Sequence, residues 1–237
     1  MEDRLPTYVK GLDERMEGGV PKGHLVLVCG RAGTMKSTLC FHILFNSAKR
    51  RKTRGIYLTL EQSRVSLLSQ MIRLGMDPRT LAESGIIVID MTRLRKESAG
   101  TATAGDINWN DSIVTTVQSY RNKFGCDIFV LDSLAALYSL STFKNPRNDV
   151  YFLFERLREL GMTTYLISEM LEANKQVFGI YGVEDFLADG IFHLDLERDG
   201  RRVNLFLSTV KMRKTNHERN YFPLIFDPST GFEIVTD

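Results

Sequence analysis

The chain has 237 residues, with 31 lysines and arginines against 29 aspartates and glutamates and a formal net charge of +2. Because 43% of its residues are hydrophobic, it can bury a sizeable core, which excludes a disordered chain, a collagen-like repeat and a small disulfide scaffold. No apolar run approaches the roughly 18 residues of a membrane-spanning helix, so no membrane role is predicted. The weak net charge also means that binding of nucleic acid would need a local basic patch.

The cysteines and the lack of internal boundaries favour one intracellular domain. Cys29, Cys40 and Cys126 follow no disulfide pattern and cannot all pair, which is typical of a protein in the reducing cytoplasm. No linker or repeat divides the sequence. We therefore expect residues 1–237 to form a single cytoplasmic domain.

Strand-like apolar runs alternate with runs of helical period, a pattern typical of an α/β protein with a mainly parallel sheet. In chain order the patterns predict strands at 24–29, 55–60, 86–90, 127–132 and 163–168, with helices at 37–48, 64–74 and 111–124 and another from Asn148 or Asp149 to 160. Gly75 is expected to end the second helix and Pro78 to begin a short one. The polar stretch 95–106 is expected to be a loop.

The last part of the chain changes to alternating polar and apolar residues. Residues 190–198 and 202–211, joined at Asp199 and Gly200, predict an antiparallel hairpin. Residues 222–227 and 232–235 predict further short strands. We therefore expect an antiparallel extension of the parallel sheet.

The segment Gly30-Arg-Ala-Gly-Thr-Met-Lys-Ser37 lies between the first strand and the first helix. Backbone N–H groups and the helix N-terminus can hold phosphates there, while Lys36 supplies a positive charge and Ser37 a hydroxyl for Mg²⁺. Met35 replaces the glycine that usually precedes the lysine of this motif. The alternative is an ordinary strand-to-helix turn without a ligand.

Two carboxylates follow predicted strands and support nucleotide binding. Asp132 ends one apolar run and is placed to orient water on Mg²⁺, although aspartates at strand ends are often turn formers. Glu61 follows another strand and can align or deprotonate the water that attacks a γ-phosphate; the alternative is a solvated loop residue. On a parallel sheet, both emerge at the edge where ligands bind.

Further segments extend this pattern over nearly the whole chain: Gly11-Leu-Asp13, Gly18-Gly-Val-Pro-Lys-Gly23, Tyr181-Gly-Val-Glu-Asp-Phe186 and Lys211-Met-Arg-Lys-Thr-Asn-His217. Together with the loop, they resemble the single-domain KaiC-like ATPases of the RecA superfamily of P-loop NTPases. The resemblance implies a RecA-like fold that binds ATP and Mg²⁺ at the subunit interfaces of a homohexameric ring. In that family a K-x-R-x-x-x-H segment of one subunit reaches the phosphates held by the next.

The resemblance assigns roles to individual residues. It implies nucleotide contacts by Gly30, Arg31, Ala32, Gly33, Thr34, Met35, Lys36, Ser37 and Thr38, and contacts to a neighbouring subunit's nucleotide by Lys211, Met212, Arg213, Thr215, His217 and Asp227. The catalytic residues would be Glu61, Lys36, Arg213 and Lys211, and the metal site would comprise Ser37, Asp132 and Glu61. Cations supplied from outside the loop would stabilise the transferring phosphoryl group.

The sequence departs from this family at positions that affect function. Gln62 follows Glu61 where the family commonly has a second glutamate, so we expect slow turnover. Asp185 and Phe186 occupy the places where the two-domain clock members phosphorylate Ser and Thr, so we expect no autokinase activity of that type. With a single copy of the domain, a self-sustaining clock is not expected.

Alternative functions are a DNA-binding recombinase relative and an ATP-binding scaffold that does not hydrolyse ATP, as in archaellum motor accessory proteins. Recombinases of this superfamily bind DNA through loops that would correspond to 139–148 and 171–182. These segments carry or adjoin mixed charges, Lys144, Arg147 and Lys175 against Asp149, Glu172 and Glu184, which makes a poor surface for DNA. The run 49–54 is more basic, but cations are also expected at the end of a helix. We favour a nucleotide-dependent oligomeric switch or signalling ATPase.

Overall fold

The computed structural model describes residues 3–81, 85–92, 108–141, 143, 145–170 and 177–236. The loop expected at 95–106 lies outside these residues, as do Lys144, Glu172 and Lys175 from the segments compared with DNA-binding loops.

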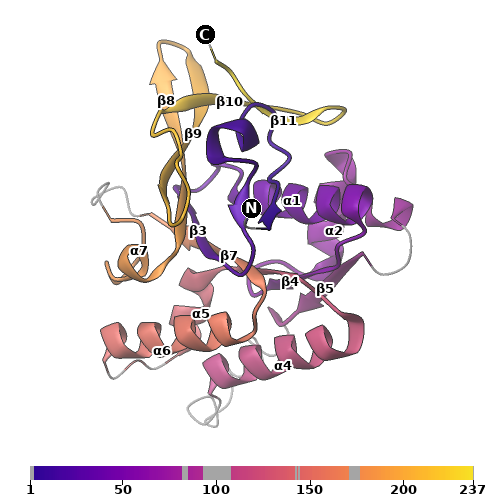
Figure 1. The fold of residues 1–237 in the computed structure, drawn as a ribbon, viewed down its shortest axis with the longest axis vertical. Helices are drawn as coiled ribbons and strands as arrows, with labels where there is room; N and C mark the ends of the chain where they lie inside the picture. Colours follow the sequence, from indigo (N-terminus) through magenta and orange to yellow (C-terminus); the bar gives the residue numbers. More distant parts are fainter. Residues whose placement is uncertain are drawn as a thin grey trace.

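A nine-stranded sheet of order β11-β10-β9-β8-β3-β7-β6-β4-β5 organises the molecule (Figure 1). Strands β5, β4, β6, β7, β3 and β8 pair in parallel, and β9, β10 and β11 continue the sheet in antiparallel pairing. Their bounds are β3 Leu25–Gly30, β4 Gly55–Thr59, β5 Ile86–Asp90, β6 Ile128–Asp132, β7 Thr163–Glu169, β8 Gly190–Asp199, β9 Arg202–Met212, β10 Phe222–Asp227 and β11 Gly231–Ile234. A small separate sheet pairs β1 (Arg4–Leu5) with β2 (Val20–Pro21).

Helices cover both faces of the parallel part of the sheet. Helices α1 (Lys36–Arg51) and α2 (Arg64–Arg73) lie on one face, and α4 (Trp109–Phe124), α5 (Leu134–Leu140) and α6 (Pro146–Glu159) lie on the other (Figure 1). Shorter turns of helix are η1 (Asp13–Met16), η2 (Pro78–Thr80) and α7 (Glu184–Leu187). Gly75, with a φ of +80°, follows the end of α2 as expected. In the described residues no helix is long and apolar enough to cross a membrane.

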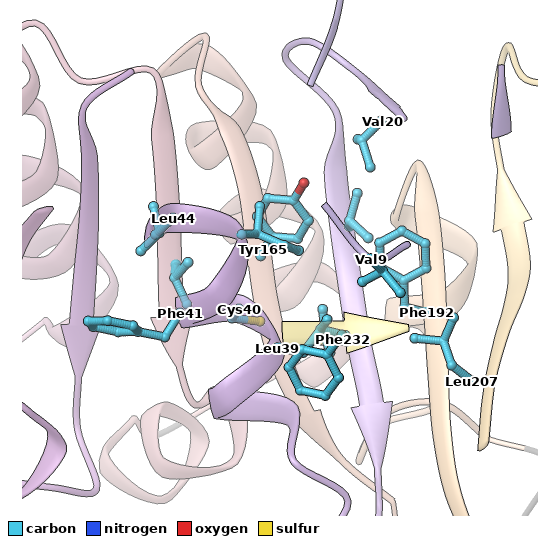
Figure 2. Packing of buried hydrophobic residues seen from close by; sticks show 14 of the residues in the cluster. Val9, Val20, Leu39, Cys40, Phe41, Leu44, Tyr165, Phe192, Leu207 and Phe232 are labelled. Atoms are coloured by element: carbon cyan, nitrogen blue, oxygen red, sulfur yellow. The ribbon is translucent and has the colours of Figure 1, made fainter. Parts of the chain in front are cut away.

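Strand β3 shows how the sequence divides the core between the two faces. Val26 and Val28 join the hydrophobic cluster under α1 and α2, while Leu25, Leu27 and Cys29 join the cluster under α4, α5 and α6. A strand buried on both faces reads as a continuous apolar run, as this one does. Figure 2 shows part of the first cluster, in which α1 residues, Tyr165 of β7 and residues of the C-terminal strands come together: Leu39, Cys40, Phe41, Leu44, Phe192, Leu207 and Phe232.

The fold confirms the expected α/β class with a mainly parallel sheet and an antiparallel C-terminal extension. The expected cap of the fourth helix was wrong: α6 begins at Pro146, and the side chain of Asn145 accepts a hydrogen bond from the N–H of Asn148. Proline is well tolerated in the first helical turn, so the helix extends further back than the apolar period indicates. The hairpin turn lies one residue later than expected, at Gly200 and Arg201, because Asp199 pairs with Arg202.

Candidate active site

The loop between β3 and α1 is held in one conformation by contacts of its own residues and by the close approach of β8. Thr34 is fully buried, and its hydroxyl donates to the carbonyl of Arg31 at 2.8 Å. At Gly30 a Cβ would clash with the carbonyl oxygen of Leu194 and would lie 2.6 Å from the Thr34 hydroxyl. Glycine is therefore required where the loop leaves the strand, because two segments approach its backbone too closely for a side chain.

Met35 adopts the backbone conformation that glycine adopts most easily. Its φ of 62° and ψ of 24° lie in the left-handed region, immediately before the first residue of α1. Its partly buried side chain packs against the hydrophobic cluster under α1. The loop thus keeps a left-handed residue before the lysine, at a conformational cost of about 1 kcal/mol that the packing of the side chain offsets in part.

Lys36 is turned toward the loop. Its Nζ donates to the carbonyls of Gly30 and Arg31, both at 2.8 Å, and the residue is only 9% exposed. Burial lowers the pKa of the ammonium, and the charges of Glu169 and Asp132 act in the opposite direction. The cation is therefore fixed at the loop by partners that a phosphate group can supplement.

The carboxylates predicted from the strand ends lie close together at the same edge of the sheet. Asp132 pairs with Thr59 on the neighbouring strand, and Glu61 lies two residues after Thr59 in the chain. Glu61 accepts a hydrogen bond from the hydroxyl of Ser133. The hydroxyl of Tyr57 donates to Oδ2 of Asp132 at 2.5 Å. Burial raises the pKa of Asp132, while hydrogen bonds from Tyr57 and Ser37 lower it.

These groups surround one cavity of about 570 Å³. The expected residues that line it come from the loop, the start of α1 and the two strand ends: Ala32, Gly33, Thr34, Met35, Lys36, Ser37, Thr38, Glu61 and Asp132. Gln62 also lines it, and its side-chain oxygen is buried without a hydrogen-bond partner in the described part of the chain. A cavity of this volume is in the usual range for a small-molecule ligand.

The structure adds residues that our sequence analysis assigned no role in the site. Gln70 and Arg73 of α2 and its C-cap Leu74 reach the cavity. Ser133, the N-cap of α5, and Ile167 and Glu169 of β7 line it as well. Glu169 ends β7, beside β3, so it obeys the same strand-end rule that indicated Asp132. That signal was available in the sequence, but the predicted strand stopped one residue earlier. The residues on α2 left no local signal, because only the packing of that helix brings them to the loop.

The loop lies at the C-terminal ends of the parallel strands, and the basic segment at 211–217 lies toward their N-terminal ends. Met212 pairs with Gly190, and Gly190 pairs with Val26, which lies four residues before Gly30. At a rise of about 3.3 Å per residue, this places the segment roughly 13 Å from the loop along the strands. Within one chain, the basic segment and the cavity are therefore separated.

Lys211 and Arg213 contact the segment around α7. Nζ of Lys211 donates to the carbonyl of Asp185 at 2.8 Å, and Arg213 donates to the carbonyl of Phe186 at 3.1 Å. Arg213 also pairs with Asp189 at 2.9 Å. Burial raises the pKa of Asp189, but a backbone hydrogen bond from Leu25 together with nearby arginines lowers it overall.

The remaining expected nucleotide contacts fall in separate places. Thr215 accepts a hydrogen bond from Arg4 at 2.8 Å, and Nδ1 of His217 lies 3.2 Å from the Thr215 carbonyl. Arg31 turns away from the cavity and pairs with Asp195 at 2.8 Å. Asp227 is the last residue of β10, where the chain turns toward β11, and its carboxylate accepts a hydrogen bond from the backbone N–H of Ser229 at 2.8 Å. The structure thus brings the loop and the strand-end carboxylates together, but not these residues.

Comparison with known proteins places this chain in a family. A family model described as "ATPase: KaiC" matches residues 5–237. The chain belongs to the KaiC family of ATPases. Its β3–α1 loop, parallel sheet and flanking helices agree with the RecA-like P-loop architecture that the resemblance implied.

The KaiC relatives are distant in sequence, and the solved structure of one KaiC-like protein is similar in fold. The chain is 26% identical over 222 residues to the circadian clock oscillator protein KaiC of Parasynechococcus marenigrum, covering 93% of this chain and 42% of that protein. It is 26% identical to the circadian clock protein KaiC3 of Synechocystis sp., covering 98% and 46%. The crystal structure of a KaiC-like protein from Pyrococcus horikoshii matches with a TM-score of 0.82 and 25% identity over 100% of both chains. The chain therefore spans less than half the length of the curated KaiC relatives it matches.

Proposed function

We propose that this chain binds ATP with Mg²⁺ in the cavity formed by the β3–α1 loop and hydrolyses it slowly. The observation that carries the proposal is the convergence of a buried lysine, a closed loop at a helix N-terminus and strand-end carboxylates around one cavity of about 570 Å³. An ordinary strand-to-helix turn requires none of these groups. We further propose that residues 1–237 act as a single cytoplasmic domain.

The residues of the cavity suit a Mg²⁺-bound nucleotide. Mg²⁺ usually takes few protein ligands besides substrate phosphates and water, and the Ser37 hydroxyl and the Asp132 carboxylate are both in the cavity. When bound, the ion would neutralise charge on the phosphates. Lys36 and the N–H groups of the loop would hold the phosphates themselves.

Glu61 is the proposed base or orienting group for the attacking water. Its carboxylate is exposed to the cavity and accepts a hydrogen bond from Ser133, which restricts its orientation. Gln62 can orient water but cannot accept a proton. A single carboxylate at this position supports slow turnover.

We propose that Lys211, Arg213 and His217 act on the nucleotide of a neighbouring copy, with Arg213 as an arginine finger. Met212, Thr215 and Asp227 would contribute to the contacts with its base and ribose. The separation of roughly 13 Å between the basic segment and the loop supports action between copies rather than within one. Contacts at a head-to-tail interface of this kind close into a ring when the rotation between copies closes, and we propose that it does here. Nucleotide state would then govern assembly, as expected for an oligomeric switch without autokinase activity.

The alternatives receive less support from the contacts of the cations concerned. Several members of the basic run contact their own chain: Arg51 donates to the carbonyl of Arg4, Arg54 donates to that of Phe124, and Arg50 lies over the ring of Tyr8. These contacts suit a helix end better than a DNA-binding surface. The scaffold remains the alternative for the cavity itself, because Gln62 replaces a carboxylate.

Phosphate release distinguishes the ATPase from the scaffold. We expect wild-type protein, assayed over a concentration range that permits assembly, to release phosphate at a slow rate that Glu61→Gln lowers at least tenfold. Glu159→Gln, at an exposed position at the end of α6, is the matched control and should keep the wild-type rate. Equal background rates for the wild type and Glu61→Gln would reject hydrolysis in favour of the scaffold.

A further inference from the structure

Tyr57 is a buried phenol in the middle of β4, among residues that are otherwise apolar. It is fully buried, pairs in register with Val88 and Val130 on the neighbouring strands, and has the ring of Phe41 at 5.8 Å. A buried hydroxyl needs a hydrogen-bond partner. Its partner is Oδ2 of Asp132, at 2.5 Å.

The alternation of residues along neighbouring strands explains this contact. Tyr57 and Thr59 lie on the same face of β4, and Thr59 pairs with Asp132 at the end of β6. Ile128, Val130 and Asp132 likewise point to the face covered by α1, as the cluster membership of the two apolar residues shows. Tyr57 pairs with Val130, two residues before Asp132, so the contact between the phenol and the carboxylate is a diagonal one. Aromatic side chains are long enough to make such diagonal contacts between neighbouring strands.

Asp132 is held from a second direction by the helix that carries the loop. The hydroxyl of Ser37 acts on the Asp132 carboxylate as well and lowers its pKa, so polar groups from β4 and α1 both face it. The carboxylate is only 3% exposed, and it has little freedom once Oδ2 is occupied by the phenol. Oδ1 is not used by Tyr57, and Asp132 is among the residues that line the cavity.

We propose that Tyr57 is a positioning residue for the Mg²⁺ of the bound nucleotide, and that it acts by fixing the orientation of the Asp132 carboxylate. The inference rests on the proposed function and assigns Tyr57 no contact with substrate. Groups that orient the partners of a metal in this way commonly change metal affinity by 10-fold or more when removed, as a general estimate. A merely structural tyrosine would affect stability without changing the Mg²⁺ requirement.

Tyr57→Phe removes the donor and keeps the ring that packs against Phe41. We expect a fluorescent ATP analogue to bind this variant and the wild type equally in EDTA. The Mg²⁺ concentration needed for half-maximal enhancement of that binding should rise about tenfold in Tyr57→Phe. This is a binding measurement and does not depend on turnover.

Tyr165→Phe is the matched control. Tyr165 is also fully buried, on β7, and it flanks Val130 on the other side from Tyr57 in the same row of the sheet. Its hydroxyl has no hydrogen-bond partner among the described residues. This variant removes a buried hydroxyl from the same core, so its Mg²⁺ midpoint should stay at the wild-type value.

The outcomes separate the inference from the proposed function. Both are overturned if the wild-type protein fails to bind the analogue, or if Mg²⁺ does not enhance its binding. Normal wild-type behaviour with an unchanged midpoint in Tyr57→Phe, or an equal shift in Tyr165→Phe, overturns the role of Tyr57 alone. If Tyr57→Phe unfolds, 4-aminophenylalanine at position 57 keeps a donor on the ring and should preserve the wild-type midpoint; a shifted midpoint in that folded protein also overturns the role.

Discussion

Met35 stands at the position where phosphate-binding loops usually carry glycine, and it has the left-handed backbone that glycine would supply. The side chain therefore does not change the path of the loop; it changes what surrounds it, by packing against the core under α1. This finding removes one reason to regard the loop as a non-binding turn. It also shows why the sequence motif alone was ambiguous, because the motif does not reveal the backbone conformation of Met35.

Replacing Met35 tests whether its side chain obstructs the phosphates. We expect Met35→Gly to change ATP affinity by less than about threefold, because glycine adopts the same left-handed backbone. Its stability should also change little, because it relieves about 1 kcal/mol of backbone cost and loses a comparable amount of packing. Fluorescent nucleotide titration and thermal unfolding measure the two effects. Met35→Ala keeps the Cβ and separates packing from conformation. A gain in affinity of tenfold or more in Met35→Gly would show that the thioether blocks the cradle.

Single residues of the site differed in how far the sequence could reveal them. Lys36, Asp132 and Glu61 occupy positions that a local motif or a strand end identifies. Tyr57 left no such signal, because a tyrosine inside an apolar strand reads as core until the register places its hydroxyl beside Asp132. Arg73 is another such case, since a cation in the last turn of a helix is expected for electrostatic reasons alone.

At the scale of elements, α1 is attached to the C-terminal strands through His42. Its ring lies edge-on to Phe232 of β11 at 5.3 Å, Nε2 lies 3.1 Å from the carbonyl of Tyr8, and Asn46 contacts Nδ1 at 3.2 Å. The residue is 4% exposed. Burial lowers the pKa of His42, with a hydrogen bond to the Tyr8 backbone acting in the opposite direction and Arg50 lowering it further.

The lowered pKa of His42 predicts a loss of stability in acid. As the pH falls below about 6.5, the unfolded chain takes up the proton first, so the free energy of unfolding drops until the pH reaches the folded pKa. The slope is at most about 1.4 kcal/mol per pH unit. Urea unfolding at pH 7.5 and 5.5 should show the stabilities of the wild type and His42→Gln converging at the lower pH. Parallel pH dependence of the two proteins would contradict this account.

Long elements were predictable, and short ones were predictable only where a local signal marks them, as Pro78 marks the start of η2. Strands buried on both faces read as apolar runs, and their positions held to within a residue or so. Helix α5 has seven residues and directly follows β6, so its period could not be separated from the preceding apolar run. Ser133, which accepts the N–H of Ala136 as a helix cap, was a usable signal for its start. Helix α7, with four residues, carries too little pattern to be recognised.

For the whole molecule, the two ends of the parallel strands carry different groups. The loop and the carboxylates lie at the C-terminal ends of these strands, and Lys211 and Arg213 lie toward their N-terminal ends. The alternation of strands and helices predicted a parallel sheet, but strand order depends on which strands meet in space. The separation of the two groups therefore emerged only with the fold, and it gives a physical reason for the proposed contact between copies.

Mixing variants tests that contact. Glu61→Gln and Arg213→Ala should each be nearly inactive alone, for lack of the base and of the finger respectively. If subunits mix at random, about a quarter of the interfaces in an equal mixture join an intact cavity to an intact finger. Phosphate release should then recover to about a quarter of the wild-type rate. No recovery, in a mixture shown to exchange subunits, would place the arginine and the glutamate in one chain's site or exclude the finger.

Calorimetric titration with ATP and Mg²⁺ tests nucleotide binding by the β3–α1 loop most directly. We expect one site per chain for the wild type and at least a tenfold loss of affinity in Lys36→Ala. Binding should be unchanged in Lys49→Ala, which removes an exposed lysine from the other end of the same helix. A wild type that does not bind, or a Lys36→Ala variant that binds as tightly as the wild type, would contradict nucleotide binding by this loop.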